Sequence, residues 1–174
     1  NLWASSQNGN LTKLNTKTWL FEKKDFKEIA SINSISNIGD WLLMSSTIGV
    51  YLLNTLSLEV RTVPLNIDEL EIEYIYGAEE TFWIGTKSGS IMALSSLEKE
   101  LDIKEIQLSN SANSRIIPIF KSGTTLWVNE GGRIALYDIA NVNNIVEHKT
   151  SLGNIYVNSV QVVDGEYWLS TNNN

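Results

Sequence analysis

Several residue types are scarce in this chain of 174 residues, which has no cysteine, two prolines and one histidine. The lack of cysteine excludes disulfides, thiolate metal sites and a cysteine nucleophile, and it fits a reducing or an oxidising compartment equally well. With so little proline, the turns must depend on Gly, Asn, Asp and Ser. His148 stands alone, without a second histidine to share a metal ion. We therefore expect no metal and no cofactor.

Positive charge and long apolar runs are also lacking. Thirteen Lys and Arg residues stand against 20 Asp and Glu residues, giving a net charge of −7 without a basic cluster. We therefore expect no nucleic acid partner and no contact with an anionic membrane surface. No apolar run approaches the ~20 residues of a membrane span, and no signal peptide opens the chain. Its start at Asn1 instead of Met favours a piece of a longer protein.

The sequence does contain a repeat. An apolar residue, Trp, an apolar residue, a small residue and Ser or Thr recur, with Gly about six residues after the Trp. The Trp position of this template falls at residues 3, 43, 83, 127 and 168, with Leu43 as the single substitute. The intervals are 40, 40, 44 and 41 residues. The repeat cores lie near 2–14, 42–53, 82–94, 126–138 and 167–171.

Each repeat predicts about four short strands. An alternating apolar run follows each Gly, as in 50–53, another precedes each Trp, as in 34–38, and a further run follows the hairpin, as in 58–63. A period near 40 with four strands per unit is typical of β-propellers. The template Trp would be a wedge between blades, because it contributes a large apolar area. Residues 3, 83, 127 and 168 are therefore expected in the core, and the off-template Trp19 and Trp41 at an edge.

We predict an all-β fold of β-propeller blades, four-stranded antiparallel repeats of about 40–44 residues, in a single propeller domain or partial propeller over residues 1–174. A β-sandwich is the rival, but it requires no self-similarity along the sequence. Three assemblies stay open. Four blades could close as a small ring, two halves from two chains could join, or the chain could be a piece of a larger propeller, which the start at Asn1 favours.

Two copies of the repeat carry a family resemblance. Residues 81–91 (TFWIGTKSGSI) and 125–138 (TLWVNEGGRIALYD) resemble the core of the two-component regulator propeller repeat, and the copies at 3, 43 and 168 are degraded. That family builds the periplasmic sensor region of hybrid two-component histidine kinases, which respond to oligosaccharides. The resemblance implies a non-catalytic sensory domain, a periplasmic location and a parent protein in the inner membrane. Unlike the family, the chain has few repeats and no kinase region.

No constellation of residues points to catalysis. Acidic residues crowd residues 68–80, but a glycosidase needs two carboxyl groups that face one cleft, and we interpret this stretch as a solvated surface. The nucleophile elbow Gly-x-Ser-x-Gly is absent. Residues 85–89 contain Gly-x-Lys-Ser, but a phosphate loop needs a helix after it, and the context here predicts a hairpin. We therefore expect no enzyme activity.

A ligand would bind where loops converge at one end of a propeller channel, at the loops that enter each innermost strand. Tyr, Arg and Asn side chains in these loops suit the hydroxyl groups and ring faces of sugars. The candidate ligand-binding residues are Asn33, Tyr74, Arg115, Tyr156 and Asn158.

Two other functions are weighed against oligosaccharide sensing. One is a protein–protein interaction scaffold of generic propeller type, since propellers without catalytic residues can serve in this way. The other is a hydrolase or lyase built on a propeller. Self-association or further blades from the parent chain are the expected protein contacts.

Overall fold

The computed structural model describes residues 1–6, 9–26, 29, 31–66, 72–108, 114–141, 144–148 and 150–172. Their regular secondary structure consists of seventeen β-strands. No helix in these ranges is long and apolar enough to cross a membrane. The chain divides into two compact units, Asn1–Leu70 and Glu71–Asn174.

The first unit contains two antiparallel sheets, which we call blades 1 and 2. Blade 1 consists of β1 (Leu2–Ser5), β2 (Asn10–Leu14) and β3 (Phe21–Asp25). Blade 2 consists of β4 (Ile32–Ile38), β5 (Trp41–Ser46), β6 (Gly49–Asn54) and β7 (Val60–Val63).

The second unit contains three antiparallel sheets, blades 3 to 5. Blade 3 consists of β8 (Ile72–Ala78), β9 (Thr81–Thr86), β10 (Ser90–Ser95) and β11 (Asp102–Gln107). Blade 4 consists of β12 (Ile116–Ser122), β13 (Thr125–Glu130), β14 (Arg133–Asp138) and β15 (Val146–His148). Blade 5 consists of β16 (Val157–Val163) and β17 (Glu166–Thr171).

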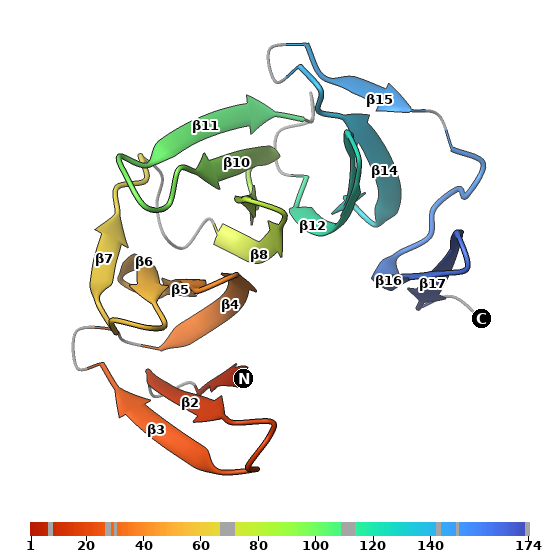
Figure 1. Cartoon of the computed structure of the whole chain (residues 1–174). Helices are drawn as coiled ribbons and strands as arrows, with labels where there is room; N and C mark the ends of the chain where they lie inside the picture. Colours follow the sequence, from red (N-terminus) through yellow and green to blue (C-terminus); the bar gives the residue numbers. More distant parts are fainter. Residues whose placement is uncertain are drawn as a thin grey trace. The chain divides into compact units, whose positions relative to one another are not determined.

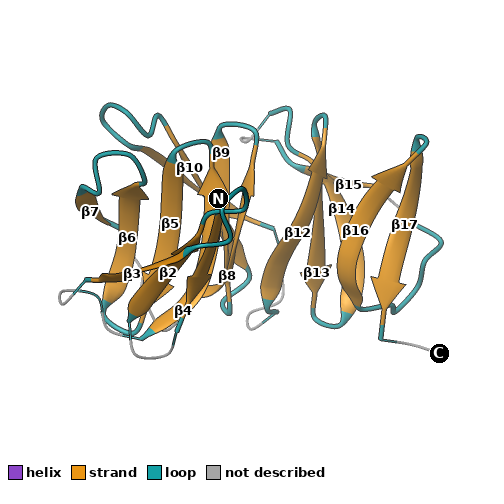
Figure 2. Ribbon diagram, turned by 60° about the horizontal axis from the view of Figure 1, so that its bottom comes forward, coloured by secondary structure: helices purple, strands orange, loops and turns teal. Residues whose placement is uncertain are grey.

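Strands that are consecutive in the sequence pair as neighbours in every blade, so each blade is an up-and-down meander. The described loops lie at the two ends of the strands (Figure 2). The template Trp position lies on the second strand of each complete blade, and Trp3 on β1 and Trp168 on β17 are its counterparts in the end blades. By this alignment, blade 1 begins at a second strand and blade 5 holds a first and a second strand.

The template residues pack against the blade that follows them in the sequence. In the second unit, Trp83 shares a core cluster with Ile116 of β12, and Trp127 shares one with Val157 of β16. In the first unit, Trp3 is partly buried against a cluster that contains Ile32 of β4. The prediction that the template Trp packs between blades is therefore confirmed at these three positions, because each indole packs with residues of the first strand of the next blade.

Trp168 departs from this pattern. Trp83 and Trp127 are 4% and 8% exposed, whereas Trp168 is 62% exposed. The expectation that Trp168 lies in the core is therefore wrong for this structure. Of the off-template residues, Trp41 lies under the guanidinium group of Arg61, 4.8 Å from the ring centroid, while Trp19 is exposed.

The small residue of the template touches the next blade. At Gly85, an added Cβ would lie 2.0 Å from the carbonyl oxygen of Ile116. Asn129 occupies the same template position in blade 4 and is buried. Its side chain donates to the oxygen of Val157 at 2.6 Å and accepts from the nitrogen of Val157 at 3.0 Å. Blades 3 and 4 therefore meet through the close approach of Gly85 to the backbone of Ile116. Blades 4 and 5 meet at the equivalent strands through the two hydrogen bonds of the Asn129 amide to the backbone of Val157, which we call the Asn129 clamp.

The Ser or Thr of the template closes the central hairpin of its blade. Ser46 donates from Oγ to the oxygen of Gly49 at 3.1 Å, and Thr86 donates from Oγ1 to the oxygen of Ser90 at 2.9 Å. In blade 4 this residue is Glu130, whose buried carboxylate accepts from the hydroxyl of Tyr137 at 2.9 Å and pairs with Arg133 at 2.5 Å. Glu130 therefore replaces the hydroxyl contact of the other blades with contacts to Tyr137 and Arg133, which lie on the other strand of the same hairpin.

Candidate functional site

The candidate site lies in the second unit, at the beginning of the first strands of three consecutive blades. Strand β12 contacts both β8 and β16, and these three strands lie on one side of the unit, with β11 and β15 on the other (Figure 1). Where they begin, side chains surround a hollow of about 380 Å³. A second hollow of about 340 Å³ adjoins it and shares four of its lining residues, Glu73, Ile117, Asn129 and Tyr156.

Four of the five predicted ligand-binding residues line these hollows. Tyr74, Tyr156 and Asn158 line the larger one. Arg115 and Tyr156 line the smaller one. Asn33 is exposed on β4, in the first unit. A role in ligand binding stays a prediction for all five residues.

A β-bulge recurs at the start of the first strand. The register shifts between Ile32 and Ser34 in β4, between Ile72 and Tyr74 in β8, and between Val157 and Ser159 in β16. The extra residues are Asn33, Glu73 and Asn158. A bulge leaves one residue outside the ladder and changes the direction of its side chain. In blades 2, 3 and 5, a polar residue therefore stands outside the ladder near the start of the first strand.

In β12 the same irregularity occurs further along the strand. The register shifts between Pro118 and Phe120. Pro118 has no N–H to donate to a ladder, and proline within sheets is confined to edges and bulges. Blade 4 therefore contributes to the site in a different way, through Arg115 just before the strand and Asn129 on β13.

Several polar groups around the hollows contact a neighbouring polar group. Arg115 Nη1 lies 3.4 Å from Glu73 Oε1, which joins blade 3 to blade 4. The carbonyl oxygen of Arg115 accepts from the nitrogen of Gly131 at 3.3 Å. Asn158 donates from Nδ2 to Asn172 Oδ1 at 2.7 Å. These contacts link Arg115 to Glu73 and Asn158 to Asn172 beside the hollows.

Two tyrosines flank the hollow from the β8 side. Tyr74 is exposed, while Tyr76 is partly buried. Burial raises the pKa of Tyr76 above its usual value, and the nearby carboxylate of Glu79 acts in the same direction. The phenol therefore stays neutral near pH 7 and can both donate and accept a hydrogen bond.

Sequence reasoning missed Tyr76 and Asn129 as lining residues. Asn129 could have been found, because it places an amide where the template of blades 2 and 3 has Ser45 and Gly85. The site offers phenol rings, amides and one ion pair. Among the described residues, no group of three or more His, Asp or Glu side chains could hold a metal ion.

Solved structures share this fold. The chain superposes on the extracellular domain of BT4673 from B. thetaiotaomicron, assigned as a hybrid two component system, with a TM-score of 0.71 and 14% identity over 98% of this chain. It superposes on virginiamycin B lyase from Staphylococcus aureus with a TM-score of 0.73 and 16% identity over 97% of this chain. It superposes on the β-propeller domain of Cps50 (Swd1) from Myceliophteria thermophila with a TM-score of 0.68 and 15% identity over 98% of this chain.

The blades are those of a β-propeller. The match covers 23% of the BT4673 domain and 58% of each of the other two proteins, so the chain spans about a quarter to just over half of these propeller proteins. No family model matches the sequence, and no curated protein matches it. The likeness at this level of identity shows the fold alone, because propellers host many unrelated functions.

Proposed function

We propose that this propeller is the non-catalytic ligand-sensing part of a periplasmic two-component signalling protein, anchored in the inner membrane, and that its hollow binds an oligosaccharide. The observation that carries the proposal is the lining of that hollow by three tyrosines and two asparagines from neighbouring blades. Ligand pockets combine apolar and aromatic walls with a few oriented polar groups, in volumes from about 300 Å³ upward. Phenol faces can stack on sugar rings, while amides meet their hydroxyl groups.

The lining also supports binding without hydrolysis. A glycosidase needs two carboxyl groups flanking the scissile bond. Among the residues that line the two hollows, Glu73 carries the single carboxylate, and Arg115 lies against it. The lining therefore offers one carboxyl group where a glycosidase needs two.

The experiment is a glycan array probed with the purified chain, followed by calorimetric titration of the best oligosaccharide. Tyr74→Ala and Tyr156→Ala should each weaken binding at least about 10-fold, which corresponds to ~1.4 kcal/mol. Trp19→Ala is the control, because it removes an exposed aromatic ring that does not line the hollow. Failure of every glycan to bind would refute the ligand class. Binding that survives both tyrosine substitutions would refute the site.

A protein-interaction scaffold is the second candidate function. It is supported by an exposed apolar run, Trp19, Leu20 and Phe21, at the hairpin between β2 and β3. Contiguous exposed apolar residues often mark protein contacts. A tight and specific glycan in the array would count against this alternative. The absence of any glycan, together with a protein captured through this hairpin, would favour it.

A further inference from the structure

Arg115 is the one positively charged side chain among the described residues that line the two hollows. It lies just before β12, beside the smaller hollow, and its side chain is 66% exposed. Its guanidinium group contacts the carboxylate of Glu73, with 3.4 Å between Nη1 and Oε1. A charge-assisted hydrogen bond between such groups is usually about 2.7–2.9 Å long, so this contact is a loose one.

A second arginine of the same unit shows what one guanidinium group can hold. Arg133 contacts the carboxylate of Glu130 through Nη2 and that of Glu147 through Nη1. A guanidinium group carries five N–H donors in one plane, so it can serve two carboxylates at once. Arg115 contacts a single carboxylate among the described residues, that of Glu73. Since most of its side chain is exposed, it retains donors for a second carboxylate that enters the hollow.

The surroundings of Arg115 leave room for such a group. Gly131 and Gly132 line the same hollow in the turn between β13 and β14, and a Cβ added to Gly132 would meet no atom within 4 Å. Tyr156 lines both hollows. A sugar ring that stacks on Tyr156 can therefore place a carboxyl substituent in the smaller hollow and its neighbouring sugars in the larger one.

The acidic character of the whole chain does not oppose a carboxylate at this place. The net charge of −7 is spread over the sequence, and exposed charges more than about 8 Å apart are largely screened at physiological ionic strength. Within the hollow, the charges of Arg115 and Glu73 balance. The planar fork of the guanidinium group matches the two oxygens of a carboxylate, which gives it a preference over a single hydroxyl group.

We propose that the oligosaccharide bound in this site is an acidic one, with the carboxylate of a uronic acid on the guanidinium group of Arg115. The inference rests on the proposed function, because it names the class of sugar that the same site binds. Glu73 positions Arg115 from the wall of the hollow, and the ligand supplies a second carboxylate, as Glu147 does for Arg133. Arg115 thus determines specificity between acidic and neutral oligosaccharides of the same size.

The test compares oligosaccharides that differ only in the carboxyl group. Uronic acid oligomers of several linkages, each paired with its carboxyl-reduced neutral form, are titrated calorimetrically into the purified chain. The best acidic oligomer should bind at least about 10-fold more tightly than its neutral partner, because a hydrogen bond to a charged group is stronger than one between neutral groups. Raising the salt concentration should narrow this difference, since salt screens the charges.

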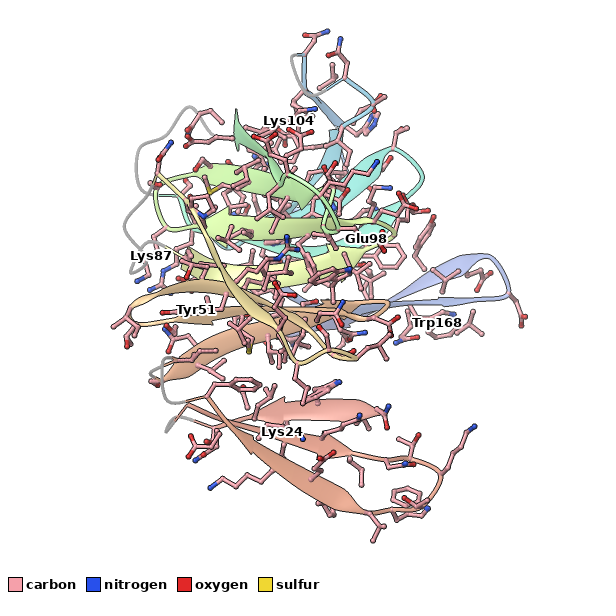
Figure 3. The ribbon with its side chains drawn as sticks, turned by 60° about the vertical axis from the view of Figure 1, so that its left-hand side comes forward. Lys24, Tyr51, Lys87, Glu98, Lys104 and Trp168 are labelled. Atoms are coloured by element: carbon pink, nitrogen blue, oxygen red, sulfur yellow. The ribbon has the colours of Figure 1, made fainter. Side chains whose placement is uncertain are left out.

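Two variants of the ion pair separate a ligand contact from a purely structural one. Arg115→Gln should weaken binding of the acidic oligomer at least about 10-fold, and should change binding of its neutral partner less than about 3-fold. Glu73→Gln should bind the acidic oligomer at least as tightly as the wild type does, because it removes a competing carboxylate. Lys104→Gln is the control for the loss of one positive charge, since Lys104 is exposed on β11, lines neither hollow and is labelled in Figure 3.

The outcomes distinguish this inference from the proposed function. If no oligosaccharide of either kind binds, the proposed function is refuted and the inference fails with it. If the neutral forms bind as tightly as the acidic ones, oligosaccharide binding stands and the role of Arg115 is overturned. The role of Arg115 is also overturned if Glu73→Gln or Lys104→Gln loses as much acidic binding as Arg115→Gln. Circular dichroism and the melting temperature check that each variant is folded.

Discussion

A missing side chain sets how closely blades 3 and 4 approach. The Cβ that Gly85 lacks would lie 2.0 Å from the Ile116 oxygen and 2.6 Å from Pro118 Cδ. Both are atoms of a strand that cannot move without disturbing its own ladder, so the added methyl group must push the two blades apart. Forcing extra volume into a packed interior typically costs ~1–3 kcal/mol of stability. Because the nearest atom at Gly85 belongs to the backbone of Ile116, we expect a cost at or above the upper end of that range.

We expect Gly85→Ala to lower the free energy of unfolding by about 3 kcal/mol or more in urea denaturation followed by circular dichroism. Gly39→Ala is the control, since Gly39 has a φ of +53° and no atom within 4 Å of an added Cβ. Its free energy of unfolding should fall only by the ~1–2 kcal/mol that the left-handed conformation costs a residue with a Cβ. Equal losses for the two variants would show that the blades do not meet at Gly85 as described.

At the scale of the element, one turn is used twice in the first unit. In blade 1, Asn15 accepts through Oδ1 from the nitrogen of Lys17 at 2.9 Å, and Trp19 has a φ of 58°. In blade 2, Asn54 accepts through Oδ1 from the nitrogen of Leu56 at 3.0 Å, and Leu58 has a φ of 61°. Asparagine starts such turns because its side chain mimics a backbone acceptor. The left-handed residue that follows is strained unless it is glycine.

We expect Trp19→Gly to raise the free energy of unfolding by about 0.5–1 kcal/mol, because it relieves this strain and removes a side chain that is largely exposed. Trp19→Ala separates the two effects, since it removes the ring but keeps the Cβ that causes the strain. It should leave stability nearly unchanged. Chemical denaturation of the three proteins side by side provides the measurement, and a glycine variant no more stable than the alanine variant would contradict the account.

The order and type of the elements could be predicted from the sequence, whereas the details of the site could not. The repeat core 82–94 corresponds to the hairpin of β9 and β10, because alternating apolar residues and a glycine turn act locally. The bulges at Asn33, Glu73 and Asn158 depend on how each strand pairs with its neighbour, so they left no local signal. The clamp of Asn129 on Val157 joins residues 28 positions apart.

The exposure of Trp168 shows the same limit at the scale of the whole molecule. Its local sequence is that of a buried template residue, and the repeat alone predicts a core position. What decides its exposure is which side chains pack against it in three dimensions, which is a property of the tertiary structure and not of the segment. Sequence pattern thus predicts which face a residue occupies but not what covers that face.

The stability of the whole molecule should depend on tyrosine ionisation at high pH. Burial raises the pKa of Tyr137, and the hydrogen bond to Glu130 with the charges of Glu130 and Glu147 raises it further. Burial also raises the pKa of Tyr76. A folded-state pKa above the unfolded value of about 10 means that the folded protein favours the neutral phenol. This contribution is complete below pH 10 and is lost as the pH rises through the folded-state pKa.

The unfolding free energy of the wild type should therefore fall above about pH 10, by up to ~1.4 kcal/mol per pH unit for each such tyrosine. Tyr137→Phe should be less stable than the wild type at pH 8, because the buried carboxylate of Glu130 loses a donor, but its decline above pH 10 should be shallower. Urea unfolding from pH 8 to pH 11 measures both slopes. General repulsion in this acidic protein lowers both curves alike, so only the difference between them reports on Tyr137, and parallel curves would rule out its contribution.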